Sequence, residues 1–207
     1  MDAASESLAG LVVSRETIQR LELFVAILQK WNPAINLVSK ASAHDAWIRH
    51  VLDSAQIYSA APANVQHWVD LGSGGGFPGL VLACIAAELQ PQARFTLIEA
   101  DQRKATFLRQ AAQELNLKVQ VLAQRIESTP PQAADVVSAR ALAPLDQLLS
   151  YAAWHLAPSG VGLFPKGTNF AAEVVDARKK WDFDIVVIPS KTEPAAAVLK
   201  VKDLKHV

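Results

Sequence analysis

The residues best suited to chemistry form a glycine-rich run at positions 70–79, Asp-Leu-Gly-Ser-Gly-Gly-Gly-Phe-Pro-Gly. An apolar segment that carries Asp70 leads into the glycines, and Pro78 follows them. Glycine accepts positive φ and leaves no Cβ between the main chain and a ligand. Proline suits the first turn of a helix, because the N–H that it lacks would be unpaired there. The run therefore predicts a strand, a turn and a helix N-terminus that bind a nucleoside-containing cofactor.

Two cofactor classes compete for this turn. Three glycines satisfy the dinucleotide pattern G-x-G-x-x-G: Gly74, Gly76 and Gly79. Glu99 follows a second apolar segment at the distance that an NAD site requires. However, the glycines already begin at Gly72, two residues after Asp70. That carboxylate would repel a pyrophosphate and attract an ammonium or sulfonium ligand, directly or through a water. The run resembles motif I of class I S-adenosylmethionine-dependent methyltransferases, which we favour over NAD enzymes. A turn without a ligand is least favoured, because so many glycines cost chain entropy.

Composition indicates one folded unit. The 207 residues are 51% hydrophobic and 19% charged, which suits a single domain with a sizeable core. We expect residues 1–62 to form a helical extension and residues 63–207 the α/β core. No apolar run reaches the length of a membrane helix, and the N-terminus lacks the pattern of a signal peptide. We therefore expect a cytoplasmic protein in which Cys84, the single cysteine, packs in the core.

The charge balance argues mildly against a nucleic-acid-binding protein. The 20 basic and 20 acidic residues give no net charge, although local patches can still attract phosphates. Three groups of basic residues are candidates: Arg103, Lys104 and Arg109; Arg178, Lys179 and Lys180; and Lys200, Lys202 and Lys205. Each group taken alone is also typical of a solvated face.

The elements that position these residues follow from apolar periodicity. Helical spacing predicts helices at 14–31, with Ser14 as the cap and Trp31-Asn32-Pro33 as the end, and at 42–59. Strands are predicted at 65–71, 94–99, 118–123, 134–139, 160–166, 183–189 and 196–202. Helices are predicted between them at 78–90, 102–115, 144–156 and 169–181. This alternation predicts an α/β, Rossmann-like fold: a seven-stranded, mostly parallel sheet whose last strand is antiparallel, with ligands beyond the carboxyl ends of the strands.

Functional side chains follow several of these strands. Ile126 and Glu127 follow the third strand, where this fold class binds adenine, and Glu127 could equally begin the next segment. Arg140 ends the fourth strand, where an arginine must be paired or functional. A salt-bridged structural role is its alternative. Lys166 ends the fifth strand, and its alternative is a solvated loop lysine.

A further cluster precedes the glycine run. His50 and Asp53 are spaced to share one helix face, with Arg49 beside them. Such a pair is often only a bridged surface pair. No other His or Cys completes a zinc ligand set at sensible spacing, so we expect no metal site.

Together these segments resemble the bacterial ribosomal RNA small-subunit methyltransferase G family, formerly called glucose-inhibited division protein B. The resemblance covers nearly the whole chain and rests on these segments, in the family's order: Trp31-Asn32-x-x-x-Asn36-Leu37, Arg49-His50-Val51-Leu52-Asp53-Ser54, the 70–79 run, Ser138-Ala139-Arg140-Ala141 and Lys166-Gly167. It implies methylation of guanine N7 in 16S rRNA, in a loop near the decoding site. It implies cofactor contacts at Gly72, Phe77, Ile126, Glu127 and Arg140, with Glu99 at the ribose. Phe77 stands where Leu is common, and Glu99 where Asp also occurs.

Guanine N7 already carries a lone pair, so its methylation needs no general base. We expect Arg140 to donate to guanine O6 or to support the methionine end of the cofactor. Lys166 is expected to contact RNA phosphate, and His50 and Asp53 to shape the base pocket. We expect a monomer that acts on 16S rRNA or the small ribosomal subunit. A small-molecule methyltransferase is the alternative; an NAD oxidoreductase and a non-catalytic binding module are less favoured.

Overall fold

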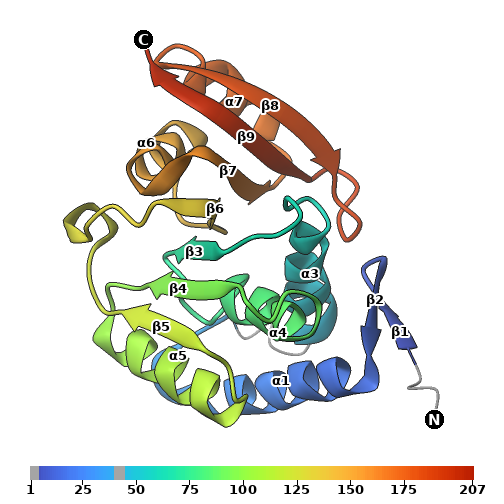
Figure 1. Cartoon of the computed structure of the whole chain (residues 1–207). Coiled ribbons are helices and arrows are strands. Elements are labelled where there is room, and N and C mark those ends of the chain that lie inside the picture. Colours follow the sequence, from blue (N-terminus) through green and yellow to red (C-terminus); the bar gives the residue numbers. More distant parts are fainter. Residues whose placement is uncertain (1–4, 40–44) are drawn as a thin grey trace.

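The computed structural model describes residues 5–39 and 45–207 and contains a seven-stranded sheet in the order β5-β4-β3-β6-β7-β9-β8 (Figure 1). The strands are β3 (His67–Leu71), β4 (Arg94–Ile98), β5 (Val119–Leu122), β6 (Ala134–Ser138), β7 (Leu156–Lys166), β8 (Trp181–Pro189) and β9 (Ala197–His206). Pairing is parallel from β5 to β7, whereas β9 is antiparallel to both β7 and β8. The predicted fold class, the seven strands and the antiparallel last strand are thus confirmed.

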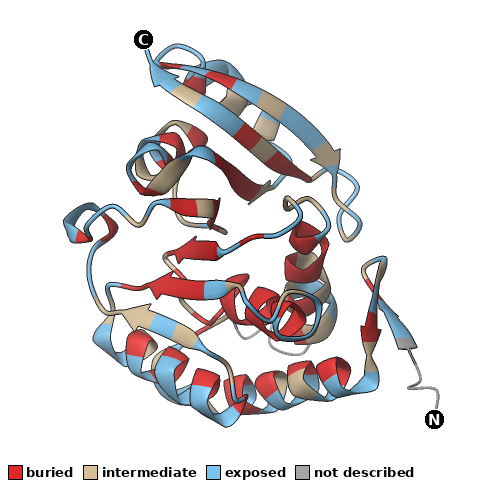
Figure 2. Cartoon of the chain, viewed as in Figure 1, coloured by how far each residue is buried: buried red, intermediate tan, exposed pale blue. Residues whose placement is uncertain are grey.

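Helices follow the strands as the alternation predicted. They are α4 (Gly79–Leu89), α5 (Gln102–Glu114), α6 (Leu145–His155) and α7 (Phe170–Ala177), with a 3-10 turn η2 (Ile126–Ser128) after β5. Successive residues of a strand face opposite sides of the sheet. All of β3 is buried (Figure 2). Trp68 joins the core cluster that contains residues of α4 and α5, while Val69 joins the cluster that contains residues of α6. Cys84 is fully buried in the first cluster, as expected.

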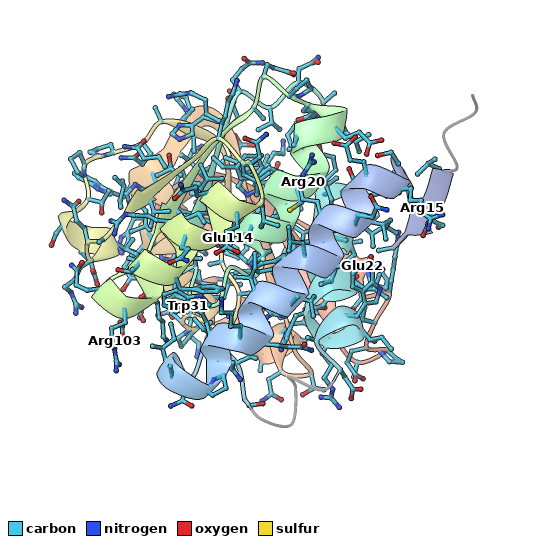
Figure 3. All side chains as sticks on the ribbon, turned by 90° about the horizontal axis from the view of Figure 1, so that it is seen from below. Arg15, Arg20, Glu22, Trp31, Arg103 and Glu114 are labelled. Carbon is cyan, nitrogen blue, oxygen red and sulfur yellow. The ribbon has the colours of Figure 1, made fainter. Side chains whose placement is uncertain are left out.

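The N-terminal part holds α1 (Arg15–Ile35), which packs across α4 and α5. Its N-cap Ser14 accepts a hydrogen bond from the Thr17 N–H, as predicted. On the side of α1 toward α5, the Trp31 ring meets the Phe107 ring edge-on, with centroids 5.8 Å apart (Figure 3). The hairpin of β1 (Ser5–Leu8) and β2 (Leu11–Ser14) was not predicted, since the strands are short.

The predicted end of α1 at residues 31–33 was wrong. The helix contains Pro33 and continues to Ile35, so this proline removes one hydrogen bond to the preceding turn without ending the helix. Asn36 ends it in the left-handed conformation, with its N–H on the Asn32 carbonyl at 3.0 Å. The Asn32 side chain also accepts from the Val38 N–H.

The second predicted helix is only partly confirmed. Residues 42–44 of the expected span 42–59 lie outside the described residues. A π-helical segment η1 (Trp47–Leu52) leads directly into α3 (Asp53–Tyr58). π-Helical turns are frequently found at functional sites, and this one carries His50.

The extension supports the glycine run. The Phe24 ring of α1 lies against the Phe77 ring, with centroids 5.1 Å apart. The division of the chain at residue 62 stays a prediction, and this packing favours one domain over two. Within residues 5–39 and 45–207, no helix combines the length and the hydropathy needed to cross a membrane.

Candidate active site

The glycine turn follows β3 and leads into α4. Gly72, Gly74 and Gly76 adopt positive φ of 62°, 53° and 86°. A Cβ added at Gly72 would lie 2.6 Å from a methyl carbon of Leu142, so a larger residue would force the Leu142 side chain to move. A Cβ at Gly74 would instead come no closer than 3.7 Å to any atom of the described residues. The turn is therefore packed on one side and presents bare backbone on the other, as cofactor binding requires.

Glu99 lies at the carboxyl end of β4, beside this turn. One carboxylate oxygen accepts from the Gly74 N–H and the other from the Asp101 N–H, each at 2.8 Å. The residue is 8% exposed. Because each carboxylate oxygen can accept a second bond, Glu99 can hold the turn and still receive two ribose hydroxyls.

Asp70 lies beneath the turn and is fully buried. Its Oδ1 accepts from the Ser138 hydroxyl at 2.6 Å, and Ser138 in turn accepts from the Trp68 indole N–H at 2.9 Å. Burial raises the pKa of Asp70 to about 6. Contact between Asp70 and the cofactor stays a prediction, and its burial favours an indirect role through the turn.

We expect Ser138→Ala to lower the free energy of unfolding by about 1–3 kcal/mol, because Asp70 and Trp68 each lose a buried partner. Urea denaturation of the variant and wild type measures the loss. Ser150→Ala on the exposed face of α6 is the matched control and should change stability little. Equal stability of the two variants would contradict the importance of the buried hydroxyl.

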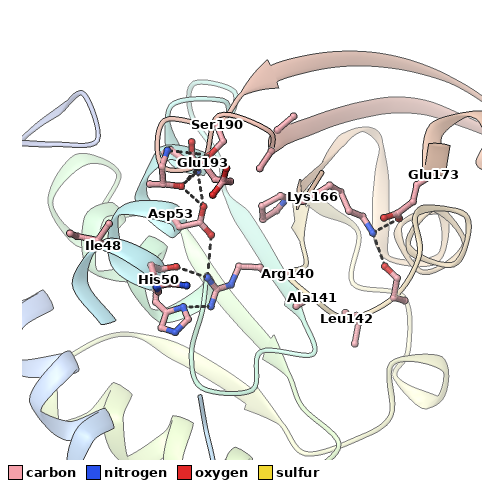
Figure 4. A pocket seen from close by; sticks show the side chains of 18 of the residues that line it. Ile48, His50, Asp53, Arg140, Ala141, Leu142, Lys166, Glu173, Ser190 and Glu193 are labelled. Carbon is pink, nitrogen blue, oxygen red and sulfur yellow. Dashed lines mark hydrogen bonds and ion pairs between the residues drawn. The ribbon is translucent and has the colours of Figure 1, made fainter. Parts of the chain in front are cut away.

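Arg140 follows β6 and forms hydrogen bonds with all three residues of the cluster that precedes the glycine run, Arg49, His50 and Asp53 (Figure 4). Its Nη1 donates to Asp53 Oδ2 and to the Arg49 carbonyl, both at 3.2 Å. Its Nη2 lies 2.9 Å from His50 Nδ1. The guanidinium lies over the Phe77 ring, 5.3 Å from its centroid, and the His50 ring centroid lies 4.8 Å from the same ring. The sequence-predicted residues thus meet where the cofactor turn ends.

His50 is neutral at physiological pH. Burial, and then the charge of Arg140, lower its pKa to about 4. Since a guanidinium only donates, Nδ1 must accept and the ring proton must sit on Nε2. That Nε2 is buried and has no hydrogen-bond partner among the described residues.

This depressed pKa predicts a pH-dependent stability. The folded pKa lies below the ordinary 6.5, so the unfolded chain binds more protons between about pH 4 and 6.5. His50 therefore contributes stability that is complete above this window and falls as the pH drops through it. We expect the difference in unfolding free energy between wild type and His50→Gln to shrink from about pH 7 to about pH 5. Urea denaturation at both pH values measures it, and a constant difference would exclude this titration.

A cavity of about 960 Å³ opens beside this cluster. Its size falls in the range of about 300–1,000 Å³ that is usual for ligand pockets. All four residues expected to be catalytic line it: His50, Asp53, Arg140 and Lys166. The β6 and β7 ends and the loop between β8 and β9 supply much of its wall. The structure thus brings together residues from four distant segments.

Lys166 is not a solvated loop lysine, and that interpretation was wrong. Its side chain is 10% exposed, and Nζ donates to Glu173 and to the Ala143 carbonyl, each at 2.7 Å. Glu173 also accepts from the Leu145 N–H, which begins α6. The Lys166–Glu173 pair therefore stabilises the loop after Arg140. Contact of Lys166 with RNA phosphate stays a prediction.

Sequence reasoning missed the residues that hold Asp53. Its Oδ1 accepts from the Thr192 hydroxyl and from the Gln56 side-chain N–H, each at 2.9 Å. Gln56 also accepts from the Lys191 N–H in the loop between β8 and β9. Gln56 lies one turn further along α3, but no local pattern could indicate Thr192, because that contact joins segments far apart in the chain.

Ile126 and Glu127 form the turn η2 after β5. Ile126 is buried and offers an apolar wall. Glu127 is exposed and accepts from the Tyr151 hydroxyl at 2.9 Å. Since the Glu99 N–H bonds the Leu122 carbonyl, the ends of β4 and β5 adjoin, as a shared cofactor site requires.

The sheet order and the glycine turn at its centre define a class I S-adenosylmethionine-dependent methyltransferase. Solved structures share this fold. The SAH-bound methyltransferase PaMTH1 of Podospora anserina matches 97% of this chain and 90% of its own, with a TM-score of 0.60 at 11% identity. The mitomycin 7-O-methyltransferase MmcR matches 91% of this chain and 68% of its own, with a TM-score of 0.58 at 15% identity.

The chain belongs to the rRNA small subunit methyltransferase G family, whose sequence model matches residues 17–196. The ribosomal RNA small subunit methyltransferase G of Cereibacter sphaeroides is 54% identical over 97% of each chain. That of Ruegeria pomeroyi is 50% identical over 95% of this chain and 96% of its own. The resemblance found in the motifs is thus confirmed, and S-adenosylmethionine is the cofactor. Among the described residues, no group of three or more His, Cys, Asp or Glu could hold a metal ion.

Proposed function

We propose that this protein transfers a methyl group from S-adenosylmethionine to N7 of a guanine in 16S rRNA of the small ribosomal subunit. One observation carries the proposal: the polar cluster of Arg140, Asp53 and His50 contacts Phe77 of the cofactor turn and also lines the cavity. A base in that cavity would lie beside the cofactor. Membership of the family supports 16S rRNA as the source of the base.

The described residues fit the cofactor. Glu99 would receive the ribose hydroxyls, and the bare backbone at Gly74 supports this role by leaving room for the ligand. Ile126 would pack against the adenine of the cofactor, with Glu127 beside it. Gly72 and Phe77 would contact the amino-acid portion of the cofactor. The bound cofactor supplies a methyl group on a positively charged sulfur.

Methylation at N7 requires alignment rather than proton removal. The cofactor would supply its methyl carbon to the N7 lone pair with loss of the carbon–sulfur bond, so that the positive charge ends on the purine and no residue has to remove a proton. Fixing the two reactants in that geometry contributes roughly 7–11 kcal/mol. Neutral His50 fits this scheme as a residue that shapes the pocket rather than a base. Arg140 has donors beyond the three bonds that it makes and would use them on guanine O6 or on the methionine end of the cofactor.

The surface that meets the RNA is not assigned to one basic group. In each of the three candidate groups at least one cation is in an ion pair: Arg103 with Asp101, Lys180 with Asp146, and Lys202 with Asp184. Recognition is proposed to rest on local charge and on the shape of the folded RNA. We further propose that the protein acts as a monomer in the cytoplasm, where its substrate is made.

Methyl transfer from labelled S-adenosylmethionine tests the function. The acceptors are small subunits from cells that lack this protein, small subunits from normal cells, and the deproteinised RNA from deficient cells. Label recovered as N7-methylguanine in the first and third acceptors is expected if RNA structure suffices. Label in the first alone would make the assembled particle the substrate. No label despite tight cofactor binding would overturn the proposal in favour of a small-molecule methyltransferase.

A further inference from the structure

The carboxylates that line the cavity differ in their partners. Three are in ion pairs with basic residues: Asp45 with Arg49 at 3.6 Å, Asp53 with Arg140 at 3.2 Å, and Glu173 with Lys166 at 2.7 Å. The fourth is Glu193, in the loop between β8 and β9. Among the described residues, no basic side chain pairs with its carboxylate. Glu193 is therefore the lining carboxylate most available to a ligand.

The loop that carries Glu193 is anchored by its own polar groups. The Ser190 hydroxyl oxygen accepts from the Thr192 and Glu193 N–H groups at 3.2 and 3.3 Å. The Glu193 carbonyl accepts from the Ala196 N–H at 3.0 Å. Thr192 also bonds Asp53, which ties the loop to the Arg140 cluster. The backbone of Glu193 is thus held in place, and its exposed side chain lines the cavity, with Oε1 accepting a long hydrogen bond of 3.5 Å from the Ala195 N–H.

The cavity has a cofactor side and an opposite side. Arg140 and His50 contact Phe77 and so mark the side of the glycine turn. In Figure 4, Glu193 lies with Ser190 on the other side of Asp53 from His50. The sheet order agrees, since β6 and β7 separate β3, which leads into the glycine turn, from β9.

A guanine in this cavity has two different edges. The edge that carries N7 and O6 must face the methyl donor. The opposite, Watson–Crick edge then points away from the turn and carries two donors, N1–H and the N2 amino group. Enzymes that act on single bases read this edge by hydrogen bonds. A carboxylate can accept from both donors at once, and its charge would also offset the cation formed by N7 methylation.

We propose that Glu193 is the specificity-determining residue for guanine, accepting hydrogen bonds from N1–H and the N2 amino group of the target base. This inference rests on the proposed function. Adenine would be rejected, because its N1 is an acceptor that would face the carboxylate. Arg140 and Glu193 would then hold the two opposite edges of one base.

Inosine, which lacks the N2 amino group, tests the contact. The substrates are small subunits reconstituted with 16S rRNA that carries guanosine or inosine at the position labelled in the assay above. Wild type should prefer guanosine by about 10-fold in kcat/KM, the value of one hydrogen bond to a charged group. Glu193→Ala should lower kcat/KM for guanosine by about 10- to 100-fold and should treat both bases nearly alike.

Asp184→Asn removes the same charge from the exposed face of β8, outside the cavity, and should keep the wild-type preference. Affinity of Glu193→Ala for S-adenosylmethionine, measured by calorimetry, should equal that of wild type. A guanosine preference that survives in Glu193→Ala, or a loss of cofactor affinity, would overturn the assignment. Wild type that leaves guanosine RNA unlabelled would instead count against the proposed function itself.

Discussion

Arg140→Ala is expected to lower kcat for methyl transfer by about 10²- to 10³-fold, the usual loss when a preorganised donor at a reacting group is removed. The substitution removes the group that joins Asp53, His50 and the Arg49 carbonyl. It also leaves the Asp53 carboxylate without its cation. The rate with labelled S-adenosylmethionine and deficient small subunits measures the loss.

One further variant and a binding measurement separate the possible roles of Arg140. Arg140→Lys keeps the charge but cannot span the three acceptors, because an ammonium lacks the planar fork of a guanidinium; it should recover little of the rate. The affinity of Arg140→Ala for S-adenosylmethionine, measured by calorimetry, distinguishes the two proposed contacts. A weaker affinity indicates contact with the methionine end of the cofactor. Normal affinity with slow methyl transfer indicates contact with guanine O6. Full methylation by Arg140→Ala with normal cofactor affinity would remove Arg140 from the site.

Glu99→Ala is expected to weaken S-adenosylmethionine binding by about 100-fold or more. Two hydrogen bonds from ribose hydroxyls to a charged group, each worth about 1.5–3 kcal/mol, account for a change of this size. The variant also frees the N–H groups of Gly74 and Asp101, which loosens the turn itself. Titration calorimetry with the cofactor measures the affinity directly.

A variant with a shorter carboxylate at position 99 is the informative comparison with Glu99→Ala. Glu99→Asp should retain much of the affinity, since the charge and both oxygens remain. Glu114→Ala, on the exposed face of the same α/β unit, is the control and should bind the cofactor as wild type does. If Glu99→Ala binds as tightly as this control, the ribose assignment is wrong.

Much of the sheet could be predicted because its signals are local. Apolar runs of strand length alternate with helical spacing, and each run predicted a strand that the structure contains. The secondary-structure predictions were wrong where tertiary packing outweighs local sequence preferences. Pro33 predicted a helix end, yet the helix continues to Ile35. The span 42–59 predicted one regular helix, yet Trp47–Leu52 is π-helical.

For the site, the residue types could be predicted from the sequence, but their hydrogen-bond and ion-pair partners could not. Strand order places β6 next to β3, so Arg140 had to lie near the glycine turn. Its bonds to His50 and Asp53 depend on how η1 and α3 pack against that edge. Lys166 shows the same limit: its position at a strand end was predicted, but its burial beside Glu173 was not.

The sequence by itself determined the fold class, the cofactor turn and the family, because strand periodicity, glycine spacing and motif order are all properties of neighbouring residues. Only the tertiary structure decided which charges are paired and which is available. Asp53 is paired with Arg140, which lies far away in the chain, and Glu173 with Lys166 across the turn between β7 and α7, whereas among the described residues no cation pairs with Glu193. Such pairing depends on distances in space, which the packing of helices and loops sets and which local sequence does not encode.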